Sequence, residues 1–105
     1  MIYMSNEKQI EDIISKNKNL ILIFVKGTNC GVCHAVENRI NSTFQNLYPT
    51  LDIHYLEIDN SPMFRGQHLI FTIPTLLLFY ENVEIHRESR IIDFHRLNKM
   101  IKRLI

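Results

Sequence analysis

The feature that most constrains the fold of this chain is the run LILIFV, six consecutive apolar residues at positions 20–25. A continuous run of this length, rich in branched side chains, is typical of a strand that is buried on both faces. Such a strand needs helices on both sides of its sheet, because neither of its faces can be left in contact with water. The run therefore predicts an α/β fold.

Four other segments have the spacing of helices. Residues 7–17 form the first, where Asn6 and Gln9 have the spacing of a capping box. The second starts in the segment CGVC, and its apolar positions recur every three or four residues: Val32, Val36, Ile40, Phe44 and Leu47. A short third helix is expected over residues 61–70, and a fourth follows Asp93, which can cap it.

Alternating or continuous apolar runs indicate the remaining strands. Residues 51–59 alternate between two faces, and residues 73–80 form a second continuous apolar run. The segment VEIHRES follows directly across Glu81 and Asn82, and two extended runs joined this closely predict an antiparallel hairpin. Few residues precede the first helix, so a first edge strand must be short or absent. The order of elements predicts a mixed central sheet flanked by helices, as a single domain over residues 1–105.

Composition and charge exclude several classes of protein. Charged residues make up 22% of the chain and hydrophobic residues 46%, which is ordinary for a globular protein and excludes disorder. The formal net charge of +1 predicts no nucleic-acid partner and no membrane partner. The first residues lack the pattern of a secretory signal, and the apolar run is too short to span a bilayer. A cytoplasmic location is therefore expected, where thiols are kept reduced.

The segment CGVCH, residues 30–34, has three chemical interpretations: a redox pair, half of a zinc site, or an attachment signal for haem. Haem attachment takes place outside the cytosol and uses a loop, whereas LILIFV leads these cysteines into a helix. A structural zinc site needs four ligands, and His34 is the one candidate nearby. The redox pair is therefore favoured, with no metal and no cofactor expected. A tightly bound zinc ion or a covalent haem would overturn this order.

The predicted place of the two cysteines, between a buried strand and the start of a helix, suits disulfide chemistry. The unpaired amides and the dipole at a helix start favour negative charge, which lowers the pKa of a thiol there. Cys30, at the exposed end, is expected to attack a substrate disulfide. Cys33, one turn deeper, is expected to resolve the mixed disulfide by attacking Cys30.

The chain resembles members of the thioredoxin superfamily in the strand LILIFV, in CGVC at a helix start, in YLEID and in IPTLLLF. The resemblance covers nearly the whole chain and implies a thioredoxin-like three-layer sandwich. It also implies that Pro74 follows a cis bond and faces the redox pair, and that the backbone of Ile73 pairs with an extended substrate segment. Thr75 and Asn29 join them as expected substrate-binding residues.

The chain departs from the pattern of this family where the family transfers protons. By the resemblance, Phe24 stands at the place of a buried aspartate and Tyr55 at the place of its companion lysine. Glu37, one turn after Cys33, is a candidate replacement, and His34 is a candidate modulator of the thiolate. The alternative interpretation of both is a solvated side chain. The other histidines are expected at the surface: His54, His68, His86 and His95.

These features predict a cytoplasmic thiol–disulfide oxidoreductase that reduces protein or low-molecular-weight disulfides through Cys30 and Cys33. A thioredoxin reductase or a low-molecular-weight thiol is expected to return the pair to the reduced state. The alternative is a thioredoxin-like binding or adaptor module whose cysteines are idle or regulatory. The missing aspartate favours this alternative, whereas the presence of both cysteines and of the segment IPT opposes it.

Overall fold

The strand β2 (Ile21–Lys26) lies at the centre of a five-stranded sheet in the computed structural model, which describes residues 1–105. The strands are arranged in the order β1-β3-β2-β4-β5. The short edge strand β1 (Ile2–Met4) and β2 both run parallel to β3 (Asp52–Glu57). In contrast, β4 (Thr75–Tyr80) runs antiparallel to β2 and to β5 (Val83–Ser89). The predicted mixed sheet with a short first edge strand is thus confirmed.

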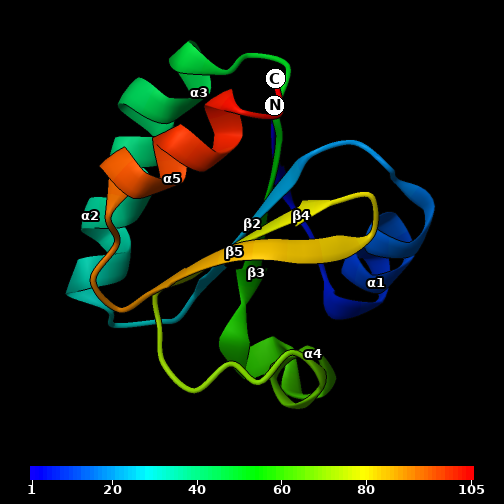
Figure 1. Cartoon of the computed structure of the whole chain (residues 1–105). Helices are drawn as coiled ribbons and strands as arrows, with labels where there is room; N and C mark the ends of the chain where they lie inside the picture. Colours follow the sequence, from blue (N-terminus) through cyan, green and yellow to red (C-terminus); the bar gives the residue numbers. More distant parts are fainter.

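Helices cover both faces of this sheet, as Figure 1 shows. On one face lie α1 (Glu7–Lys16) and α4 (Pro62–Gln67). The other face is covered by the succession α2 (Gly31–Arg39), η1 (Ile40–Phe44) and α3 (Gln45–Leu47), and by α5 (Phe94–Lys102). A single 3₁₀ turn, η2 (Ile58–Asn60), connects β3 to α4. None of the helices combines the length and the apolarity that crossing a bilayer requires.

The side chains of β2 divide between two hydrophobic cores. Leu22 and Phe24 belong to the core under α2 and α5, whereas Ile21, Ile23 and Val25 belong to the core under α1 and α4. All five are at most 1% exposed. The prediction that the run LILIFV is a strand buried on both faces is therefore confirmed.

The predicted helix starts are also present. Asn6 Oδ1 accepts a hydrogen bond from the Gln9 amide at 2.9 Å, and Gln9 Oε1 accepts one from the Asn6 amide at 2.8 Å, which completes the capping box of α1. At the start of α5, the Asp93 carboxylate accepts a hydrogen bond from the Arg96 amide at 3.0 Å. These caps satisfy amides that have no partner within a helix.

The long helix expected after CGVC differs from the prediction in that it contains the π-helical turn η1. After Cys33, its buried side chains are Val36, Ile40, Phe44 and Tyr48, the last three each four residues after the previous one. Four residues of α-helix advance about 40° beyond a full turn, so such a series drifts around an α-helix. The wider π turn takes up this drift and keeps Phe44 and Tyr48 on the core side. Val32 and Leu47, expected in the apolar stripe, are 55% and 59% exposed.

The expectation that four histidines lie at the surface was wrong for His54. This residue is 5% exposed, because β1 and the segment after it cover that side of β3. Its ring stacks on Tyr3, and its Nδ1 lies 3.0 Å from Ser5 Oγ. Burial lowers the pKa of His54, and the negative charge of Asp52 opposes this effect only in part. His54 therefore stays neutral near pH 7.

Two further histidines are half-buried and lie against carboxylates, so they are not free surface residues either. His68 Nε2 lies 2.7 Å from Glu11, and His86 Nε2 lies 2.6 Å from Glu88. His95 is exposed, as expected.

Glu88 is a charged residue of β5 whose side chain is 1% exposed, and it connects this strand to the start of α5. It accepts hydrogen bonds from Arg96 Nε at 2.7 Å, from Arg96 Nη2 at 3.0 Å and from the Asp93 amide at 3.1 Å. Burial alone would raise the pKa of Glu88, but the hydrogen bonds from Arg96, Asp93 and His86 outweigh it and hold the pKa below its ordinary value. The carboxylate is thus fully partnered and ionised at neutral pH.

We expect Glu88→Gln to lower the free energy of unfolding by about 2 kcal/mol at neutral pH, because Arg96 and the Asp93 amide lose a charged acceptor. The folded-state pKa of Glu88 lies below its unfolded value. Its contribution is therefore present above the unfolded pKa, about 4.3, and is lost as the pH falls through the folded pKa. Urea unfolding should show the two proteins differing at neutral pH and converging in acid.

The matched control is Glu84→Gln, which breaks the surface pair between Glu84 and Arg87. It should cost less than about 1 kcal/mol. A loss for Glu88→Gln no larger than that of this control at neutral pH would contradict the role of Glu88.

Candidate functional site

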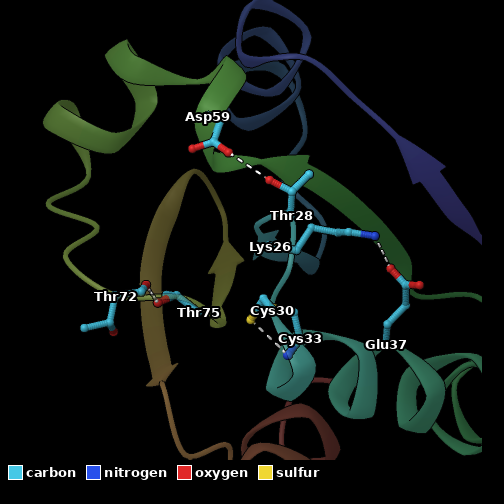
Figure 2. The surroundings of a disulfide bond; sticks show 8 residues. All are labelled: Lys26, Thr28, Cys30, Cys33, Glu37, Asp59, Thr72 and Thr75. Carbon is cyan, nitrogen blue, oxygen red and sulfur yellow. Dashed lines mark hydrogen bonds and ion pairs between the residues drawn. A yellow bond between two sulfur atoms is a disulfide. The ribbon is translucent and has the colours of Figure 1, made fainter.

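Cys30 and Cys33 form a disulfide at the start of α2, just beyond the end of β2. Their Cα atoms are 5.2 Å apart. Figure 2 shows the pair with Lys26 and Glu37 reaching toward each other on one side and Thr75 on the other. Both sulfur atoms therefore lie beyond the carboxyl end of the central strand.

The two cysteines differ in exposure and in their place on the helix. Cys30 is the N-cap residue of α2 and is partly exposed, whereas Cys33 is 2% exposed in the core under α2. The Cys33 amide donates a hydrogen bond to Cys30 Sγ at 3.2 Å. The same amide, together with the helix dipole, would stabilise a thiolate at Cys30 after reduction of the disulfide. This arrangement suits Cys30 for attack on an external disulfide.

The turn before Cys30 depends on Asn29, which has a φ of 54°. This left-handed conformation is unfavourable for most residues, and asparagine adopts it more readily than others. Asn29 is exposed directly beside Cys30, at the position expected to contact a substrate.

The Ile73–Pro74 peptide bond is cis, and it lies next to the end of β2 because Val25 pairs with Thr75. Neither the N–H nor the C=O of Ile73 takes part in a hydrogen bond within the protein. An unpaired backbone segment of this kind can bind an extended chain as an added strand. Pro74 itself is buried.

Thr75 has a different part from the one expected. Its side chain is buried, its hydroxyl donates to the Thr72 carbonyl at 2.8 Å, and Ser89 Oγ lies 3.3 Å away. Thr75 therefore holds the loop before β4 in place, and its hydroxyl is not directed to solvent.

The layer of the core that includes Cys33, Phe24 and Tyr55 is apolar. Phe24 is fully buried and packs edge to face on Tyr55, with ring centroids 5.2 Å apart. The Tyr55 hydroxyl donates to Asn41 Oδ1 at 2.9 Å. Burial, and then the negative charge of Glu37, raise the pKa of Tyr55 to about 12. Tyr55 is therefore protonated at neutral pH and cannot take a proton from Cys33.

An ion pair between Lys26 and Glu37 lies at the rim of this layer (Figure 2). The side chains are 19% and 23% exposed, and Lys26 Nζ lies 5.6 Å from the centre of the Tyr55 ring. Glu37 is the one carboxylate of α2, and it lies four residues, about one helical turn, after Cys33. The sequence did not indicate that Lys26 pairs with Glu37, since this ion pair depends on how β2 and α2 pack.

His34 is exposed, and its ring makes no hydrogen bond or ion pair within the protein. Its amide donates a hydrogen bond to the Cys30 carbonyl at 3.2 Å, so His34 lies in the first turn of α2 beside the cysteines while its ring is exposed. The loop after β5 does join the site, because the Arg90 amide donates to the Pro74 carbonyl at 2.7 Å. No sequence pattern around Arg90 indicated this contact.

Comparisons with known proteins agree with this geometry. The family model for thioredoxin matches residues 1–103. The thioredoxin-like protein YdfQ of Bacillus subtilis is 30% identical over 95 residues, which cover 90% of this chain and 83% of that protein. A thioredoxin of Chlamydia trachomatis is 28% identical over 103 residues, 98% of each chain. The X-ray structure of Fasciola hepatica thioredoxin superposes over the full length of both chains with a TM-score of 0.84 at 17% identity, which shows the same fold.

Gly27 supplies the space that Ile73 occupies, since a methyl group on Gly27 would overlap Ile73 Cδ1. We expect Gly27→Ala to force the Ile73 side chain to rotate and to lower the free energy of unfolding by about 1 kcal/mol. Urea unfolding measures the loss, and the NMR shift of the Ile73 methyl group reports the displacement.

Gly66 in α4 offers the matched control, because a methyl group there would meet nothing within 4 Å. Gly66→Ala should raise stability by up to about 1 kcal/mol through helix propensity. Equal effects of the two substitutions, with an unchanged Ile73 methyl shift, would show that Gly27 is not needed for this contact.

Proposed function

The chain belongs to the thioredoxin family, and from this we propose that it reduces protein or low-molecular-weight disulfides in the cytoplasm. Membership of this family and the paired cysteines indicate a thiol–disulfide oxidoreductase in general. The observation that carries the proposal is the arrangement of the cysteines, with Cys30 partly exposed as the cap of α2 and Cys33 buried one turn deeper.

The proposed reaction has two exchanges. The Cys30 thiolate attacks one sulfur of the substrate disulfide, which forms a mixed disulfide and releases the other sulfur as a thiolate. Cys33 then loses its proton and attacks Cys30 Sγ, which releases the second substrate thiolate and forms the Cys30–Cys33 disulfide. Two electrons pass to the substrate, and protons from Cys33 and from solvent complete its two thiols.

The reduced pair is regenerated by a separate donor, for which we propose a thioredoxin reductase or a low-molecular-weight thiol. A cytoplasmic setting supports the direction of electron flow, because thiols there are kept reduced. Neither a nucleic acid nor a membrane has a part in this proposal.

Substrate docking is proposed at the backbone of Ile73, beside Pro74 and Asn29. Support comes from the unpaired N–H and C=O of Ile73, which can bond to an extended substrate segment. Thr75 contributes indirectly, through its hydrogen bond to the Thr72 carbonyl.

Glu37 is proposed as the group that accepts the Cys33 proton, directly or through a water molecule. The two residues are four apart in α2 and share a helix face, and helical side chains lean toward the N-terminus, which for Glu37 means toward Cys33. Lys26 holds the carboxylate in place through its ion pair. His34 is proposed to act at most through its charge near the helix start.

The division of labour between the cysteines is tested by trapping. We expect Cys33→Ser to accumulate mixed disulfides with proteins of a cell extract, because the attacking thiol remains and the resolving thiol is absent. Cys30→Ser should accumulate almost none, because the remaining sulfur is buried. Non-reducing gels with and without dithiothreitol measure the complexes.

The wild-type protein should also catalyse insulin reduction by dithiothreitol, and both serine variants should lose this activity. Trapping by both variants in equal amounts would contradict the assigned roles. A folded protein that neither traps nor catalyses would support the adaptor module instead.

The role of Glu37 can be separated from that of the neighbouring Tyr55. Glu37→Gln should slow the release of a preformed mixed disulfide by at least about tenfold at neutral pH, since a proton acceptor is lost. Tyr55→Phe should leave this step unchanged, because a hydroxyl with a pKa of about 12 is not an acceptor at that pH. Rapid mixing over a pH series measures both rates, and an equal effect of the two substitutions would exclude Glu37 as the acceptor.

A further inference from the structure

A groove beside the disulfide runs between one face of α2 and the loop that joins β5 to α5. We propose that this groove binds an extended segment of a protein substrate that carries a carboxylate about three residues from its cysteine, together with an apolar side chain. The inference rests on the proposed function, and it adds the substrate class that this site would select.

Both walls of the groove are joined to the redox site. One wall begins at Val32, which lies inside the CGVC segment itself and is 55% exposed. The other wall begins at Arg90, whose amide donates to the carbonyl of Pro74 at 2.7 Å. A substrate segment that has its cysteine at Cys30 and its backbone against Ile73 therefore continues into this groove.

Most of the side chains that line the groove are apolar. Val32, Ala35 and Arg39 lie at positions i, i+3 and i+7 of α2, so they form a stripe along one face of that helix. Opposite this stripe lie Ile91, which is 84% exposed, and Ile92. An exposed isoleucine beside a reactive sulfur is favourable for binding an apolar side chain of the substrate.

The charged side chains that line the groove are both cations, Arg39 and Arg90. Both residues are exposed, and neither forms an ion pair within the protein. The Arg39 guanidinium lies over the ring of Phe94, 4.8 Å from its centre, which positions the charge without neutralising it. A substrate carboxylate in the groove would be attracted by both positive charges.

The carboxylates next to the groove are already engaged elsewhere. Asp93 accepts the hydrogen bond from the Arg96 amide that caps α5. Glu88 is buried and accepts hydrogen bonds from Arg96 and from the Asp93 amide. The positive potential of the two arginines is therefore directed to the outside, where it complements an acidic partner.

The length of the groove sets the expected position of the carboxylate. From Val32 to Arg39, α2 rises about 10 Å, at 1.5 Å per residue. An extended chain covers about 3.3 Å per residue, so this length corresponds to about three residues of substrate. A glutamate three residues from the reacting cysteine would therefore reach Arg39.

The backbone at Arg90 supports a functional part for this side chain. Its φ of 66° is left-handed, a conformation that glycine adopts without strain and arginine does not. Backbone strain that local interactions maintain is often found at binding sites. Here the strained position is the one that presents a cation at the near end of the groove.

The experiment compares peptides that differ in one side chain. Each peptide carries a single cysteine activated as a pyridyl disulfide, with glutamate, glutamine or lysine three residues from the cysteine on either side. Attack of the reduced protein on the peptide sulfur releases thiopyridone, which absorbance follows in a single turnover. We expect the glutamate peptide to react about tenfold faster than the glutamine peptide at low salt, and the lysine peptide to react most slowly. The preference should shrink at high salt.

Substitutions assign this preference to the groove. Arg39→Gln and Arg90→Gln should each reduce the tenfold ratio to about threefold, and the double variant should abolish it, whereas Arg39→Lys should retain most of it. The matched control is Lys18→Gln, which removes an equal charge before the opposite end of β2 and should leave the ratio unchanged.

Failure of the groove proposal and failure of the proposed function give different results. Dipyridyl disulfide, which is neutral and has no peptide, tests the chemistry alone. If it reacts while the three peptides react equally, the groove proposal is wrong and the oxidoreductase remains. If an arginine effect is found with oxidised glutathione but not with the glutamate peptide, the protein-segment proposal is also wrong. If dipyridyl disulfide does not react faster with the reduced protein than with free dithiothreitol, the proposed function fails.

Discussion

Burial of β2 on both faces is the constraint on which the rest of the structure depends. The side chains of Ile21 to Val25 are withdrawn from water on both sides, which requires a layer of helices on each face of the sheet. The same strand positions the site, because α2 begins soon after its end and Thr75 pairs with Val25. The disulfide and the segment around Pro74 therefore meet at one end of β2.

The apolar layer next to Cys33 shows how this site is built without a charge in the core. Ionised groups in place of Phe24 and Tyr55 would each cost several kcal/mol of desolvation unless they were paired, on the order of magnitude usual for buried ions. Lys26 and Glu37 form their pair at the rim, where partial exposure lowers this cost. The layer thus keeps its apolar packing, while a carboxylate remains one helical turn from the resolving cysteine.

Local patterns in the sequence predict most of this fold and the place of its reactive sulfurs. The run LILIFV, the caps at Asn6 and Asp93 and the segment CGVC each act within a few residues, so that periodicity and spacing are sufficient to find them. The burial of His54 depends on the pairing of β1 with β3, and the ion pair of Lys26 depends on how α2 packs on β2. No periodicity in the sequence encodes either contact. Arg90 is a similar case, since arginine does not indicate a left-handed turn.

The capping of α2 by Cys30 couples the reduction potential of the protein to its folding free energy. The Cys33 amide and the helix dipole act on a thiolate when the pair is reduced and on an uncharged sulfur when it is oxidised. By thermodynamic linkage, any free energy that this helix end gives to the reduced folded state also shifts the potential relative to that of the unfolded chain. For a two-electron couple, a free-energy difference of 1.4 kcal/mol corresponds to a shift in potential of about 30 mV. The balance between dithiol and disulfide is therefore set in part by how stably α2 packs against the sheet beyond β2.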